Sequence, residues 1–175
     1  MRNSAFELGE LIDKKKVEYK LHQPLWDKVA EIDVNLDFNQ WTKIKYLNND
    51  ATDFHPDIRI VPNNCGGLYL FSIECPVLEG VTSFPVYIGR AQLTPNQNLR
   101  KRVREYFTTF ARQQERPKVT RMIKYWGADL TISFLPLDNN NQVVDLEERL
   151  INSLLLPFND QIPNKEIQQA VNAFQ

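Results

Sequence analysis

Three short segments of the chain have the residue pattern of β-strands. Residues 67–73 (GLYLFSI) and 84–89 (FPVYIG) are rich in aliphatic and aromatic residues, and residues 129–135 (DLTISFL) alternate between polar and apolar positions. Both patterns are typical of strands. A link that contains proline and glycine joins the first two segments, so we expect them to pair as antiparallel neighbours. Together the three segments predict a three-stranded antiparallel sheet.

Apolar residues recur every three or four positions in two longer segments, residues 98–113 and 141–156. This period is typical of an amphipathic helix that packs one face against a core. The apolar face of the first helix would consist of Leu99, Val103, Tyr106, Phe107 and Phe110. The apolar face of the second would consist of Val143, Leu146, Leu150 and Leu154. The predicted fold class is α+β, with helices flanking a small sheet.

The remaining segments predict short elements around this unit. Amphipathic patterns at residues 4–18, 25–32 and 38–47 predict an N-terminal helical extension over residues 1–60, in which Trp26 and Trp41 anchor the helices. Residues 57–61 could add an edge strand. A further helix is expected at residues 118–126, ended by Gly127. The central domain would cover residues 61–163, and a C-terminal tail, residues 164–175, would form a helix at residues 165–173.

Two charged residues in the long helices stand out from the apolar pattern. Glu147 falls inside the apolar face of its helix, within roughly 20° of Leu154 in projection. A carboxylate in that position is costly to desolvate unless it is paired, hydrogen-bonded or metal-bound. Pairing with Arg102 or Arg90 is one interpretation, and metal binding is the other. Arg102 borders the apolar face of its own helix, where it is either an ordinary surface arginine or a functional group. Glu148, the residue after Glu147, is expected to face solvent.

Tyrosine and glycine occur together in the first two predicted strands. One strand begins with Gly67-Leu68-Tyr69, and the other ends with Tyr87-Ile88-Gly89-Arg90. If the strands are neighbours, both tyrosines can approach one spot. We expect the adjacent glycines to let a substrate backbone approach closely, because glycine lacks a side chain.

Charge is distributed unevenly along the chain. The net charge of the 175 residues is −1, but residues 90–124 contain ten Lys or Arg and two Glu, a net charge of +8 against −9 elsewhere. A basic segment in an otherwise acidic protein predicts a polyanionic partner such as DNA; the alternative is a pair of solvated basic helices. The candidate DNA contacts are Arg100, Lys101, Arg104, Arg112, Arg116, Lys118, Arg121 and Lys124.

Other features of the composition exclude several classes of protein. The content of hydrophobic residues, 42%, indicates a folded domain, yet no apolar run approaches the roughly 20 residues of a membrane span. The first residues lack the apolar core of a secretory signal. Cys65 and Cys75 show no metal-ligand spacing and are expected to be free thiols. We therefore expect a cytoplasmic protein with no membrane partner; no pattern in the sequence specifies its oligomeric state.

The order of these motifs resembles the GIY-YIG nuclease family, over about residues 65–163. The resemblance rests on a Gly-Leu-Tyr strand, a Tyr-Ile-Gly strand, an arginine on the next helix and a glutamate on a later one. The excision-repair members are the most similar, through the spacing of Glu147, Leu150, Ile151, Pro157, Phe158 and Asn159. The chain departs from the family in having Leu68 in place of isoleucine, a longer link between the strands and no histidine on the arginine-bearing helix. Tyr106 stands one helical turn after Arg102, as in the repair nucleases.

The resemblance implies a Mg²⁺- or Mn²⁺-dependent DNA endonuclease and its set of site residues. That set is Tyr69, Tyr87, Arg90, Arg102, Tyr106, Glu147 and Asn159. Glu147 would bind the metal, and Arg102 would stabilise charge on the phosphoryl oxygens. Tyr87 would accept the proton of the attacking water, with its pKa lowered by Arg90 and with Tyr69 as a hydrogen-bonded helper. Asn159 would hold the site together through backbone hydrogen bonds.

A second interpretation of the same motifs stays open. The domain could be a nucleic-acid-binding or interaction module on this fold, with cleavage lost or dependent on a partner. The filled polar positions favour the enzyme. If the protein is a nuclease, the sequence is compatible with three roles: restriction or phage defence, DNA repair, and the movement of mobile elements.

Overall fold

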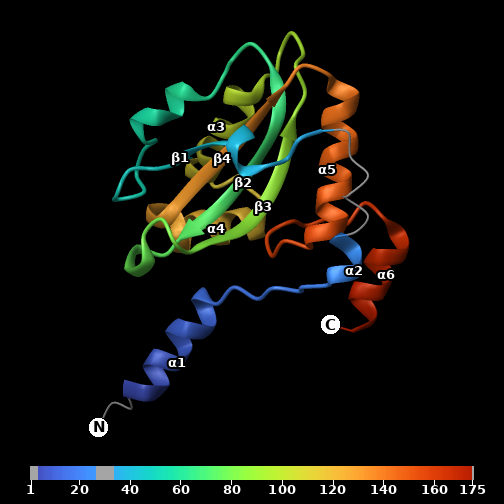
Figure 1. The fold of residues 1–175 in the computed structure, drawn as a ribbon. Helices are drawn as coiled ribbons and strands as arrows, with labels where there is room; N and C mark the ends of the chain where they lie inside the picture. Colours follow the sequence, from blue (N-terminus) through green and yellow to red (C-terminus); the bar gives the residue numbers. More distant parts are fainter. Residues whose placement is uncertain (1–3, 27–33, 175) are drawn as a thin grey trace.

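The sheet of this protein has four antiparallel strands in the order β1-β4-β2-β3 (Figure 1). In the computed structural model, which describes residues 4–26 and 34–174, the strands are β1 (Thr42–Lys45), β2 (Gly66–Glu74), β3 (Ser83–Ala91) and β4 (Leu130–Leu137). The predicted antiparallel pairing of β2 with β3 is confirmed, and β4 pairs with the other edge of β2. The α+β fold class is also confirmed.

Helices cover the two faces of the sheet. On one face lie α3 (Leu99–Ala111) and α4 (Pro117–Trp126), and on the other lies α5 (Asn140–Leu154). Because side chains alternate along a strand, Tyr69 and Phe71 of β2 join the core under α3, whereas Leu68 joins the core under α5. The remaining helices are α1 (Ser4–Lys15), α2 (Gln23–Trp26) and α6 (Lys165–Ala173).

Asparagine side chains define where three of the helices begin. Asn98 accepts a hydrogen bond from the amide of Lys101 at the start of α3, Asn139 caps α5 in the same way, and Asn164 caps α6. Asparagine at this position satisfies amides that would otherwise have no partner within the helix. The caps explain why α3, α5 and α6 begin within one residue of the predicted starts.

The N-terminal region differs most from the sequence prediction. The helix expected at residues 38–47 is wrong: a short 3₁₀ helix (Phe38–Gln40) leads into strand β1, so the sheet has four strands and not three. The segment forms a strand despite its helical pattern because the free edge of β4 offers hydrogen-bond partners to its backbone. The edge strand expected at residues 57–61 is also wrong, since Pro56–Ile60 forms a 3₁₀ helix whose first residue is proline.

Other predicted elements lie close to those observed. The helix expected at residues 118–126 is α4, and the one expected at residues 165–173 is α6. The helix expected at residues 4–18 is α1 and ends three residues earlier. Most of the helix expected at residues 25–32 lies outside the described residues. Within the described ranges, no helix combines the length and apolar content required to cross a bilayer.

Tyr46 connects the end of β1 to α3. Its side chain is fully buried, and its hydroxyl donates a hydrogen bond to the carbonyl of Val103 at 2.8 Å. The same hydroxyl accepts a hydrogen bond from the amide of Phe107 at 3.2 Å. The hydroxyl therefore stands between a carbonyl and an amide that bond directly to each other in a regular helix. This insertion fixes α3 on the sheet at the turn that carries Tyr106.

We expect Tyr46→Phe to lower the free energy of unfolding by about 1–3 kcal/mol, because the buried polar groups of α3 lose their partner. Urea denaturation of both proteins measures this difference. Tyr125→Phe, which removes a hydroxyl from a partly exposed ring on α4, is the control and should be nearly neutral. An unchanged stability of Tyr46→Phe would mean that α3 closes its own hydrogen bond once the hydroxyl is removed.

Candidate functional site

A groove runs over the edge strand β3 and collects most of the predicted site residues. It consists of two adjoining pockets, with volumes of about 410 and 330 Å³. Tyr87, Arg90, Arg102 and Glu147 line both pockets, and Tyr69 lines the larger one. These residues come from β2, β3, α3 and α5. We call this surface the edge groove.

Three tyrosines form a hydrogen-bonded chain at the base of the edge groove. The hydroxyl of Tyr106 lies 2.7 Å from that of Tyr69 and 2.9 Å from that of Tyr87. Tyr106 therefore takes the central position. We had expected Tyr69 to contact Tyr87 directly, but Tyr69 reaches Tyr87 through Tyr106. Burial raises the pKa of Tyr69 and the pKa of Tyr106 well above that of a free tyrosine. Both hydroxyls therefore stay protonated at neutral pH.

The cation beside Tyr87 is Arg116 and not Arg90. A terminal nitrogen of Arg116 lies 3.3 Å from the Tyr87 hydroxyl, and its guanidinium carbon lies 5.8 Å from the centre of the ring. Tyr87 and Arg90 are three residues apart on one strand, so their side chains leave opposite faces of the sheet. Arg90 consequently extends toward α5. Arg116 reaches Tyr87 from the connection between α3 and α4.

Arg90 and Glu147 form an ion pair on the α5 side of the edge groove. The closest nitrogen and oxygen are 2.5 Å apart, and the side chain of Glu147 is 16% exposed. Burial raises the pKa of Glu147, and the positive charge of Arg90 offsets only part of this increase. The cost of removing the carboxylate from water thus exceeds the gain from the arginine. The ion pair that we had considered for Glu147 is therefore present, but it does not fully offset the cost of desolvating the carboxylate.

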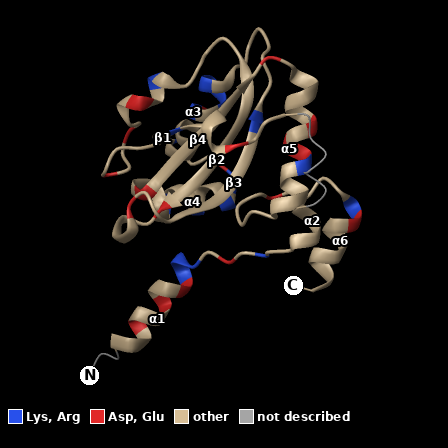
Figure 2. Cartoon of the chain, in the orientation of Figure 1, with Lys and Arg blue, Asp and Glu red and all other residues tan. Residues whose placement is uncertain are grey.

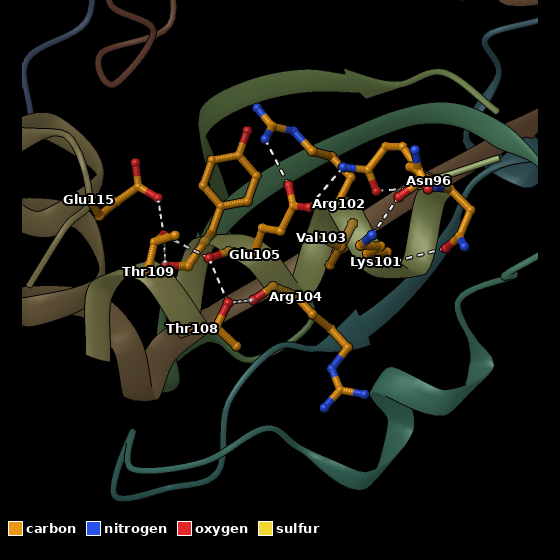
Figure 3. A network of polar contacts seen from close by, with 12 residues as sticks. Asn96, Lys101, Arg102, Val103, Arg104, Glu105, Thr108, Thr109 and Glu115 are labelled. Carbon is orange, nitrogen blue, oxygen red and sulfur yellow. Dashed lines mark hydrogen bonds and ion pairs between the residues drawn. The ribbon is translucent and has the colours of Figure 1, made fainter. Parts of the chain in front are cut away.

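Arg102 extends from α3 over the tyrosine chain. Its guanidinium lies 5.2 Å from the centre of the Tyr106 ring, and one nitrogen lies 2.9 Å from an oxygen of Glu105 (Figure 3). Glu105 also accepts a hydrogen bond from Gln97, which lines the larger pocket. Glu105 therefore orients the Arg102 side chain, which remains partly exposed to solvent.

Gly89 is required for packing within the protein. A side chain built at this position would come within 2.5 Å of the Tyr69 hydroxyl and 2.7 Å of its ring. The two residues are directly paired across β2 and β3, so the ring of Tyr69 lies over the glycine. The expected approach of a substrate backbone at Gly89 is therefore wrong, because Tyr69 fills that space. Gly67, with φ of +147°, similarly lies against the carbonyl of Leu135.

Asn159 closes the exposed edge of β3. Its side-chain oxygen accepts a hydrogen bond from the amide of Ile88 at 3.0 Å, and its side-chain nitrogen donates to the carbonyl of the same residue at 2.8 Å. The amide of Phe158 donates to the carbonyl of Val86, where the register of β3 shifts by one residue. The predicted role of Asn159 in backbone hydrogen bonding is confirmed.

Most of the candidate DNA contacts do not line the edge groove, and several bind carbonyls of the protein itself. Arg100 donates to the carbonyls of Arg59 and Val61, and Lys101 donates to that of Asn96. Arg121 donates to two carbonyls near the end of α1. Arg104 lies over the ring of Phe54, Lys124 lies near the ring of Tyr125, and Arg112 is exposed. In Figure 2, positions with acidic residues are interspersed with basic ones along the ribbon.

Two members of that set lie at the smaller pocket. Arg116 lines it, and Lys118 donates to the carbonyl of Asn159 beside it. Both approach Asp160, at 3.3 and 4.0 Å. Arg90 and Arg102 lie in the same region, and each of these four cations has a carboxylate within 4.0 Å.

Sequence reasoning missed the acidic residues around the edge groove. Glu148 is exposed to solvent, as expected, and it also lines the smaller pocket, 4.0 Å from Arg90. Asp160 lines the same pocket. Glu105 could have been found from its position three residues after Arg102, which places the two on one side of the helix. The position of Asp160 depends on the path of the chain after α5 and has no signal in the sequence.

Comparison of this chain with models of protein families, with curated proteins and with solved structures finds no match. Among residues 4–26 and 34–174, no three His, Cys, Asp or Glu side chains are grouped so that they could hold a metal ion together.

The raised pKa of Glu147 predicts that Glu147→Gln gains stability over the wild type as the pH rises. The folded protein holds the proton of Glu147 more tightly than the unfolded chain does. The stability that this protonation contributes is therefore fully present below about pH 4.3 and is lost as the pH rises through the pKa of Glu147 in the folded protein. The glutamine variant lacks this loss. Urea denaturation between acidic and neutral pH measures the difference.

Asp145→Asn is the matched control for this measurement. Asp145 lies on the same helix, is 60% exposed and pairs with Arg149, so its replacement should have little effect on stability. A Glu147→Gln variant less stable than the wild type at neutral pH would contradict the prediction, since the Arg90–Glu147 pair would then contribute net stability.

Proposed function

We propose that this protein is a Mg²⁺- or Mn²⁺-dependent DNA endonuclease of the GIY-YIG type. The observation that supports this best is the convergence of Tyr69, Tyr87, Arg102 and Glu147, from four different elements, on one groove that is open to solvent. In the sequence these residues are spread over almost 80 positions. A charged, solvent-accessible groove with hydroxyl groups at its base suits the hydrolysis of a phosphodiester.

The arginines of the edge groove would bind and stabilise the phosphate. Arg102 is oriented by Glu105 and stands over the Tyr106 ring, so its guanidinium is held in place before a substrate arrives. A donor held in this way stabilises the charge that develops on phosphoryl oxygens. Arg116, on the other side of Tyr87, would contact the same phosphate or its neighbour.

Glu147 would hold the metal ion. Burial raises the pKa of Glu147 even beside Arg90, and a bound cation would offset this cost of desolvating the carboxylate. A single carboxylate suits Mg²⁺, which keeps several waters when it binds to proteins. When bound, the ion would supply Lewis-acid stabilisation of the phosphoryl group and a more acidic water.

Tyr87 would accept a proton from the attacking water. Its hydroxyl lies between the hydroxyl of Tyr106 and the guanidinium of Arg116, both of which can donate hydrogen bonds to it. Tyr69 and Tyr106, which burial keeps protonated, would position Tyr87.

A second function is favoured by the Arg90–Glu147 ion pair. The pair occupies the carboxylate that would bind the metal. A domain in which that pair persists would bind nucleic acid through Arg102, Arg116 and Lys118 without cleaving it. The role of the enzyme in restriction or phage defence, or in DNA repair, belongs to the first proposal.

Glu147→Gln should abolish Mg²⁺-dependent cleavage of DNA and leave DNA binding largely intact, because the variant removes the metal ligand and none of the cations. Cleavage of duplex, single-stranded and branched DNA, with binding measured in parallel without metal, tests this. Asp145→Asn, on the solvent side of α5, should cleave like the wild type. Cleavage by Glu147→Gln at the wild-type rate would refute the metal assignment, and a wild type that binds but never cleaves would favour the second function.

Arg102→Ala should slow cleavage by about 2.7–4 kcal/mol in activation free energy, the usual effect of losing a donor that stabilises the transition state. Lys101→Ala is the comparison, because Lys101 lies next to Arg102 on α3 and its amine is bonded to the carbonyl of Asn96. It should change the rate little. Single-turnover rates at saturating protein separate this effect from binding. Equal losses in both variants would indicate a generic basic surface.

A further inference from the structure

The connection between β3 and α3 lines one part of the edge groove and carries no charge. It consists of residues 92–97 (QLTPNQ), and we call it the β3–α3 loop. Gln92, Thr94 and Gln97 line the larger pocket together with Arg102. An arginine favours contacts with phosphates, whereas the neutral amide of a glutamine can pair with the edge of a base. The lining of this pocket therefore suits both parts of a nucleotide.

Asn140, the first residue of α5, fixes the start of the β3–α3 loop. Its side-chain oxygen accepts a hydrogen bond from the amide of Leu93 at 2.8 Å, and its side-chain nitrogen donates to the carbonyl of the same residue at 2.9 Å. Two bonds to one residue fix both the position and the direction of the backbone there. Gln92 directly precedes this residue, so the point from which its side chain extends is defined.

The rest of the β3–α3 loop is a tight turn. The amide of Thr94 donates to the carbonyl of Gln97 at 2.9 Å, and the amide of Gln97 donates back to the carbonyl of Thr94 at 3.3 Å. The carbonyl of Asn96 accepts a hydrogen bond from the amine of Lys101 on α3 (Figure 3). The loop is therefore held by both α3 and α5 before a ligand arrives, which reduces the entropy that binding costs.

The two glutamines of the β3–α3 loop differ in what their amides bind. The side-chain nitrogen of Gln97 donates to Glu105 at 2.8 Å, and its side-chain oxygen accepts from the amide of Asn98 at 3.0 Å. Both ends of that amide are thus used within the protein. Gln92 is exposed, and no residue in the described part of the chain bonds to its side chain. Its amide is therefore available to a ligand in the larger pocket.

We propose that Gln92 recognises a base of the bound DNA, and that this base is adenine. The proposal rests on the proposed binding of DNA in the edge groove. A glutamine amide places a donor and an acceptor side by side, and adenine presents the complementary N7 acceptor and N6 amino group in the major groove. Gln92 and Arg102 line the same pocket of about 410 Å³. The adenine therefore belongs to the nucleotide whose phosphate Arg102 contacts, or to one of its neighbours.

A duplex DNA library with randomised sequence tests binding and cleavage separately. With Mg²⁺, sequencing of the new ends gives the bases around each cut. Without metal, sequencing of the protein-bound fraction gives the bases that binding alone selects. The wild type should enrich adenine at one fixed position in both experiments. Gln92→Ala should lower this preference at least about fivefold, because the two-point contact with adenine is lost.

Gln92→Glu and Gln114→Ala are the matched variants. A glutamate at neutral pH has only acceptors, so Gln92→Glu should lose the preference for adenine and favour cytosine, whose N4 amino group donates. Gln114 is an exposed glutamine in the connection between α3 and α4 and lines neither pocket of the edge groove. Gln114→Ala should therefore keep the wild-type preference.

The outcomes separate the role of Gln92 from the endonuclease. An adenine preference in binding that Gln92→Ala loses supports the role of Gln92 even if no DNA is cut, a result that would contradict the endonuclease. Cleavage without a preference for adenine overturns the role of Gln92 and leaves the endonuclease in place. An adenine preference that survives in either Gln92 variant, or that Gln114→Ala also loses, does the same. A protein that neither binds nor cuts DNA overturns both proposals.

Discussion

The candidate site depends on β3 being the edge strand of the sheet. Side chains on opposite faces of an interior strand are separated by the sheet itself. At a free edge, groups from both faces can approach each other around the strand. Tyr87 leaves β3 on the side of α3, and Arg90 leaves it on the side of α5, yet both line the same groove. Because β3 lies at the edge, Arg102 of α3 and Glu147 of α5 can line the same groove.

An exposed edge must also be protected from pairing with other chains. Here the two-point hydrogen bond from Asn159 to Ile88, and the bond from Phe158 to Val86, cover the backbone groups next to the site. The register shift at Val86 bends the strand where the chain after α5 returns. One short segment thus closes the edge and contributes Asp160 to the wall of the smaller pocket.

The chemistry of the groove follows from two opposite consequences of burial. Burial keeps Tyr69 and Tyr106 neutral, which makes them suited to donating and relaying hydrogen bonds. Burial also leaves the charge of Glu147 only partly compensated by Arg90. A neutral buried hydroxyl is stabilised by a neighbouring hydroxyl, whereas a buried carboxylate requires further positive charge. This difference is the physical basis of our proposal that a cation binds at Glu147 and an anion near Arg102.

The sequence by itself determined the local elements and the identity of the unusual residues. Runs of aliphatic and aromatic residues located β2 and β3, and the helical period located α3 and α5. The position of Glu147 on an apolar helix face marked it as a residue in need of a partner. Only the tertiary structure decided which partner each residue has. Strand β1 forms because β4 has a free edge, Arg116 and not Arg90 reaches Tyr87, and the ring of Tyr69 occupies the space over Gly89. Local patterns depend on neighbours along the chain, whereas these contacts depend on which face and which edge distant segments share.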